Sequence, residues 1–87
     1  MNILPFIHLF RELSADEVLR IELINGNKIY YLPGDAISAE PNIIIIKKLI
    51  KNKRQQIIII DANTISVICT MSRQTYDLKL NRGELYV

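Results

Sequence analysis

Apolar and polar side chains alternate over the first third of the chain in the pattern of a β-hairpin. Residues 19–23 alternate leucine and isoleucine with arginine and glutamate, which is the period of a strand with one buried face. Asn25-Gly26 follows directly, and this dipeptide favours a tight hairpin turn because both residues tolerate positive φ. Residues 28–32 are therefore the expected return strand, which Pro33-Gly34-Asp35 breaks or bends.

The segment before this hairpin has helical spacing instead. Pro5 suits the first position of a helix. Four apolar residues of segment 5–13 fall at helical spacing on one face; they are Phe6, Leu9, Phe10 and Leu13. A helix this short is unstable alone, so we expect it to lie on the open end of a sheet. Ser14 and Glu17 have capping-box spacing, so a second helix is the alternative to a strand at residues 19–23.

Two blocks of four consecutive isoleucines, Ile43–Ile46 and Ile57–Ile60, stand out in the second half of the chain. β-branched residues in a row favour strands over helices, and both faces of such strands are apolar. One face packs on the core of a small sheet, so the other face needs a cover as well. Long apolar strands left open would also promote aggregation. We therefore predict that contacts between subunits cover these strands and that the protein is a homo-oligomer.

Turn and strand signals continue towards the C-terminus. Residues 61–63, Asp-Ala-Asn, form an expected tight turn, and residues 64–68 form a last short strand. Further on, Tyr76, Leu78 and Leu80 alternate with polar residues. The sequence thus predicts one mostly β domain over residues 1–70 and a C-terminal extension over residues 71–87, which is an added strand or is partly disordered.

Size and composition restrict how such a domain is stabilised. A chain of 87 residues forms one domain at most, and a domain this small buries only roughly 60% of its unfolded surface. The single cysteine, Cys69, excludes an internal disulfide. One cysteine with one histidine, His8, cannot supply the four ligands of a structural zinc site. Association with other subunits is the remaining route, and we expect no metal and no cofactor.

Charge and hydropathy bear on location and activity. The net charge is +2, which by itself says little about partners. The apolar start is interrupted by Pro5, His8 and Arg11 and lacks a basic n-region. No apolar run approaches the roughly 20 residues of a membrane span, so we expect a cytoplasmic protein without a signal peptide. No group of residues has the spacing of an active site, and we expect no enzymatic activity.

A basic segment lies between the two isoleucine blocks. Residues 47–54 carry five positive charges and no acidic residue, on Lys47, Lys48, Lys51, Lys53 and Arg54. Such a segment binds nucleic-acid phosphates, or it is a solvated hairpin tip whose lysines oppose edge-to-edge aggregation. Tyr30 and Tyr31 also have two interpretations, since exposed tyrosines stack on bases and buried ones pack in a core or an interface.

In this order the elements resemble the Sm-like family, which includes the bacterial host-factor RNA chaperones. The resemblance covers residues 5–68. Residues 18–26 look like the family's first strand and its glycine turn. Asn42, followed by Ile43–Ile46, looks like the asparagine and apolar strand of the first Sm motif, and residues 57–68 look like the two short strands of the second motif.

The resemblance implies an N-terminal helix followed by a strongly bent, five-stranded antiparallel sheet, the Sm-like small barrel. In the family, the fourth strand of one subunit pairs with the fifth strand of the next and closes a ring of about five to seven copies. The expected interface residues come from these two strands and are Ile57, Ile58, Ile59, Ile60, Ile65 and Val67.

The resemblance also implies an RNA site, formed by Asn42 and by the turn with Asp61 and Asn63, together with the basic segment. Many members of the family carry Arg-Gly at this turn, where the arginine helps to hold RNA, whereas this chain has Asp61-Ala62. A carboxylate at that position repels phosphate. Two hypotheses follow: a ring-forming, non-catalytic RNA-binding protein, and a structural or assembly ring protein that has lost the nucleic-acid site.

Overall fold

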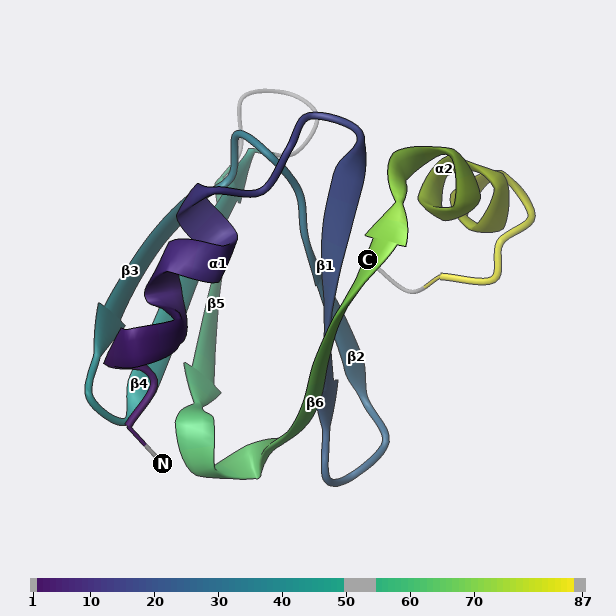
Figure 1. Cartoon of the computed structure of the whole chain (residues 1–87). Coiled ribbons are helices and arrows are strands. Elements are labelled where there is room, and N and C mark those ends of the chain that lie inside the picture. Colours follow the sequence, from purple (N-terminus) through teal and green to yellow (C-terminus); the bar gives the residue numbers. More distant parts are fainter. Residues whose placement is uncertain (1, 50–54, 86–87) are drawn as a thin grey trace.

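The computed structural model describes residues 2–49 and 55–85. These residues form six strands in two three-stranded antiparallel sheets, with the orders β2-β1-β6 and β3-β4-β5 (Figure 1). The strands are β1 (Glu17–Leu23), β2 (Lys28–Tyr31), β3 (Ala36–Glu40), β4 (Ile43–Leu49), β5 (Gln55–Asp61) and β6 (Ile65–Ser72). A 3₁₀ turn, η1 (Leu4–Phe6), and α1 (Ile7–Arg11) precede them, η3 (Ala62–Thr64) joins β5 to β6, and α2 (Arg73–Asn81) follows.

The predicted hairpin at the start of the first sheet is confirmed. β1 pairs with β2 in a register that sets Leu19 opposite Tyr31. Gly26 has a φ of 87° in the turn, a conformation that glycine adopts without steric cost. The Ser14 hydroxyl donates a hydrogen bond to the Glu17 carboxylate at 2.6 Å, which is a contact between side chains and not the side-chain-to-backbone pattern of a capping box. Glu17 begins β1, so the alternative of a second helix is wrong.

The prediction of a single bent five-stranded sheet closed as a small barrel is wrong. Within the described residues, the strands form two separate sheets, and neither is closed into a barrel. The separation occurs after β2, where Pro33 lacks a backbone donor and Gly34 has a φ of 96°. Of the two expectations for Pro33-Gly34-Asp35, a break or a bend, the structure shows the break, and the strand that follows, β3, pairs with β4 in the second sheet.

The main core lies between the two sheets and α1. Its buried members are Ile3, Phe10, Leu19, Ile21, Tyr31, Ile44, Ile46, Ile60 and Ala62. Phe10 packs edge-on against Tyr31 with a centroid distance of 5.2 Å. In Figure 1, α1 lies in front of the second sheet. The expected apolar face of the helix is only half correct, since Phe10 and Leu13 face the core but Phe6 and Leu9 are exposed.

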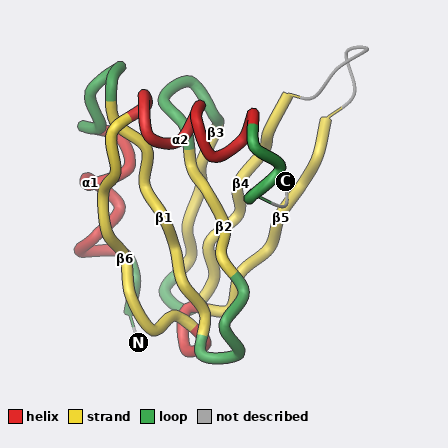
Figure 2. Tube along the Cα trace, turned by 90° about the vertical axis from the view of Figure 1, so that its right-hand side faces the viewer, coloured by secondary structure: helices red, strands yellow, loops and turns green. Residues whose placement is uncertain are grey.

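The C-terminal extension contains a helix rather than the strand suggested by the alternation of Tyr76, Leu78 and Leu80. Ser72 caps this helix, α2, because its hydroxyl accepts a hydrogen bond from the backbone N–H of Thr75 at 3.1 Å. Tyr76 packs on Val18 and Tyr30, on the outer face of the first sheet. Figure 2 looks onto this face and shows α2 crossing one end of it. The described part of the chain holds no helix with the length and apolarity needed to cross a membrane.

Candidate functional site

The free edges of the sheets are the most distinctive surface of the molecule. β5 is one outer strand of the second sheet and β6 is one outer strand of the first, and the two do not pair with each other. Along β5, every second side chain points away from the core, so that Ile57 is 56% and Ile59 is 67% exposed. Val67 on β6 is 45% exposed. Large apolar side chains therefore project beside backbone edges that have no partner among the described residues.

The six expected interface residues are divided by this alternation. Ile57, Ile59 and Val67 are exposed, which leaves them accessible to another molecule. Ile58 and Ile65 are half-buried against the core of their own chain. Ile60 is only 3% exposed, so its side chain is already covered within one copy.

The η3 turn gathers three of the residues that the resemblance assigns to an RNA site. The Asp61 carboxylate accepts a hydrogen bond from the backbone N–H of Asn63 at 2.9 Å, and the carbonyl of Asn42 accepts one from the backbone N–H of Ala62 at 2.8 Å. Asp61 also lies opposite Ile43 in the β4–β5 pair. The Asp61 carboxylate thus stabilises the turn by accepting a backbone hydrogen bond. The same carboxylate places a negative charge where the resemblance expects a cation.

The basic segment does not act as a single unit. Lys47 is exposed, whereas Lys48 is 7% exposed and its ammonium group lies 2.6 Å from the Asp35 carboxylate. Asp35 also accepts a hydrogen bond from the backbone N–H of Leu32 at 3.0 Å. The charge of Lys48 is therefore paired with Asp35 in the turn between β2 and β3. The remaining cations of the segment, Lys51, Lys53 and Arg54, lie outside the described residues.

The aromatic and titratable candidates have ordinary packing roles. Tyr30 and Tyr31 are 8% and 4% exposed, and burial raises the pKa of both phenols above the usual value of tyrosine. Neither ring is open enough to stack on a base. His8 is exposed, and Cys69 is a half-buried free thiol on β6. In the described residues, no group of three or more His, Cys, Asp or Glu side chains is placed to hold a metal ion.

An apolar groove lies beside the β6 edge, and sequence reasoning missed it. Its volume is about 300 Å³, and its lining residues are Phe6, Leu9, Ile65, Ser66 and Ile68. Ser66 is the extra residue of an irregularity in the β1–β6 register, because Leu23 lies opposite Ile65 while Glu22 lies opposite Val67. The sequence signal for this groove is the apolar spacing of Phe6 and Leu9, which by itself does not distinguish a buried helix face from an exposed one.

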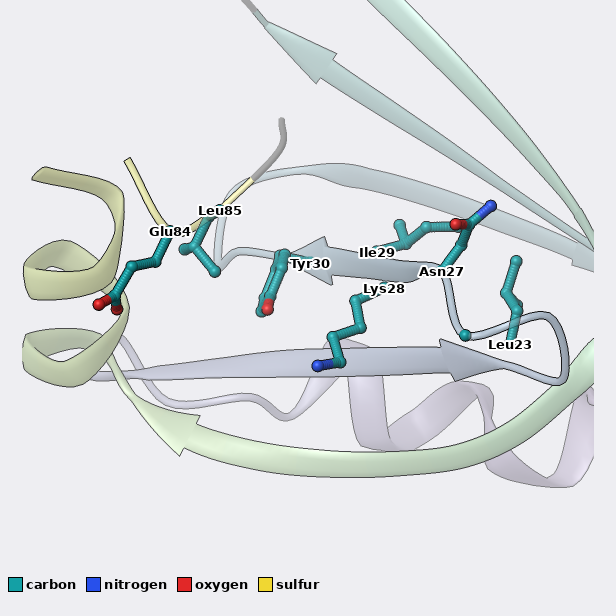
Figure 3. Close-up of a pocket in the computed structure, with 8 residues that line it drawn as sticks. Leu23, Asn27, Lys28, Ile29, Tyr30, Glu84 and Leu85 are labelled. Carbon is teal, nitrogen blue, oxygen red and sulfur yellow. The ribbon is translucent and has the colours of Figure 1, made fainter. Parts of the chain in front are cut away.

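A second hollow of about 550 Å³ lies between β2 and the segment after α2. Figure 3 shows Leu85 and Glu84 beside Tyr30, with Lys28 and Asn27 further along the hairpin. Its lining residues are Leu23, Gly26, Asn27, Lys28, Ile29, Tyr30, Glu84 and Leu85. The lining combines apolar side chains with one cation, Lys28, and one carboxylate, Glu84. Among these lining residues, the polar groups do not converge on a common ligand position.

Comparison of the chain with protein-family models, with curated proteins and with solved structures found no match.

Proposed function

We propose that this protein is a non-catalytic assembly protein that forms a head-to-tail homo-oligomer by pairing β5 of one copy with β6 of the next. This class of protein, a self-assembling structural module, accounts for the unpaired edges of the two sheets. The Sm-like resemblance supports this proposal, because the strands that pair between copies in that family correspond to β5 and β6.

The observation that carries the proposal is a contrast between the four strands that lie at sheet edges. β2 has four residues, including Lys28, and is followed by Pro33, while β3 has five residues and ends at Glu40-Pro41. Short length, charge and proline are the devices that protect an edge from pairing with another chain. β5 and β6 have seven and eight residues, and their only charged residue is Asp61, at the end of β5. These two edges lack the protection that the other two have.

A head-to-tail arrangement follows from the difference between the two edges. Each copy offers one β5 edge and one β6 edge, so the contact joins two unlike surfaces and leaves one of each free at the ends of a chain of copies. Such a heterologous contact either closes into a ring or grows into a filament. The resemblance favours a closed ring of about five to seven copies.

RNA binding is the second candidate function, and the exposed Lys47 at the start of the basic segment favours it. Two observations support the structural function over it. Lys48 is buried in an ion pair with Asp35, and Asp61 sets a negative charge at the η3 turn. Both reduce the positive charge that phosphate binding requires.

The assembly is tested with Ile59→Lys, with Ile24→Lys as the matched control. Ile59 is 67% exposed in a single copy and Ile24 is 72% exposed outside β5 and β6, so both lysines are compatible with the folded chain. At micromolar concentration we expect light scattering to give an oligomer for the wild type and for Ile24→Lys. Ile59→Lys should lower the association constant at least about a hundredfold, because an unpaired charge would be buried between copies.

Circular dichroism of the three proteins should be the same, which separates loss of assembly from loss of folding. A wild-type protein that is monomeric and folded over the whole concentration range would contradict the proposal. Equal dissociation of Ile24→Lys would also contradict it, since the effect would then not depend on the β5 edge.

A further inference from the structure

The groove beside β6 has two properties that restrict what can occupy it. Phe6 and Leu9 are each 43% exposed on its helical side, and none of its lining residues is charged. Its other wall is β6 itself, through Ile65, Ser66 and Ile68. An occupant must therefore be apolar, and a strand that pairs along the β6 edge lies next to the groove.

The β5 strand of another copy fits these restrictions. Side chains alternate between the two faces of a strand, and the Ile58 and Ile60 side chains of β5 are used by the core of their own copy. The other face carries Gln55, Ile57, Ile59 and Asp61, all exposed, and Ile57 and Ile59 are its two apolar side chains. Both are more than half exposed, and no charged residue occurs from Gln55 to Ile60.

We propose that the groove between α1 and β6 is the seat of Ile57 and Ile59 from the neighbouring copy. This inference rests on the proposed function and identifies the side chains that make the pairing specific. Backbone hydrogen bonds between β5 and β6 do not depend on side-chain identity, so they leave the alignment of the two strands open. Two isoleucines seated against Phe6 and Leu9 select the face of β5 that points towards α1, because turning the strand over would remove both from the groove.

Cross-linking with introduced cysteines tests this contact. In a Cys69→Ser background, which removes the only native thiol, the pair Leu9→Cys and Ile59→Cys is combined in one chain. Disulfides form only where Cβ atoms approach within about 4.5 Å, so mild oxidation should join copies into a ladder on a non-reducing gel. The single-cysteine variants should give no ladder, and neither should a control pair that joins Leu9→Cys to Ile24→Cys.

A second measurement does not require any cross-link to form. The chain contains no tryptophan, so Phe6→Trp provides a single fluorescent reporter at the exposed side of the groove. We expect its emission to shift to shorter wavelength as concentration rises and copies assemble. The same reporter combined with Ile59→Lys should keep the emission of an exposed indole at every concentration.

The outcomes separate the groove from the assembly. An oligomer in which the 9–59 pair cross-links no better than the 9–24 pair would overturn the groove and leave strand pairing intact. The same conclusion would follow if the emission of the Phe6→Trp reporter were independent of assembly. A protein that remains monomeric would overturn both. A ladder specific to the 9–59 pair, together with the emission shift, is the expected result.

Discussion

The ion pair between Lys48 and Asp35 links β4 to the turn that separates the two sheets. Their side chains are 9% and 16% exposed, so removing one partner leaves a poorly solvated charge. We expect Lys48→Met to lower the free energy of unfolding by about 3 kcal/mol, because an uncompensated buried charge is costly. Urea denaturation at pH 7, at one fixed protein concentration, measures the change.

The matched control is the double variant Lys48→Met with Asp35→Asn. The amide oxygen of asparagine can still accept the hydrogen bond from the backbone N–H of Leu32, and no buried charge remains. We expect this variant to recover most of the lost stability. If Lys48→Met alone unfolds at the wild-type urea concentration, the ion pair does not stabilise the turn.

At the scale of elements, α2 depends on tertiary packing. It has nine residues, which is too short for a stable isolated helix, and Tyr76 anchors it on Val18 and Tyr30. We expect Tyr76→Ala to release α2 and to cost about 3 kcal/mol of docking free energy, in the range of other buried aromatic truncations. Hydrogen exchange should then become fast at residues 73–81 while β1 stays protected.

Leu78→Ala is the control within the same helix, because Leu78 is 49% exposed and carries little of the packing. Its exchange pattern should remain that of the wild type. Loss of protection throughout β1 and β6 in Tyr76→Ala would contradict an independent docking of α2, and would assign the helix to the cooperative core.

At the scale of the whole molecule, the sign of the charge at the η3 turn decides between the two candidate functions. Asp61 ends β5, so a ring built through β5 would repeat its carboxylate at each contact between copies. A negative ring should exclude phosphate. We expect the wild type not to bind oligouridine tightly, and we expect Asp61→Arg with Ala62→Gly to gain binding that fades with salt.

Fluorescence anisotropy at low and physiological salt measures this gain, with Asp61→Asn as a control that removes the negative charge without adding a cation. Asp61→Asn should gain much less than the arginine variant. Submicromolar wild-type binding that the double substitution leaves unchanged would contradict the proposed correspondence between this turn and the second Sm motif.

Local pattern was enough to predict most of the strands. The alternation at residues 19–23, the Asn25-Gly26 turn and the two isoleucine blocks all correspond to strands or turns of the structure. In each case the determining forces act between neighbours in the chain: β-branched side chains favour extended backbone, and asparagine and glycine accept positive φ. The assignment of Ile57 and Ile59 to an interface between copies stays a prediction.

Contacts between distant residues decided the rest. The division into two sheets depends on the pairing of β3 with β4 after the break at Pro33-Gly34. The helical state of residues 73–81 depends on Tyr76 reaching the outer face of β1. Lys48 became a buried partner of Asp35 because the fold brings together residues 13 positions apart. Local periodicity indicates which side chains share one face of a helix or strand. Whether that face is buried, and which strand pairs with which, depends on contacts with residues distant in the sequence.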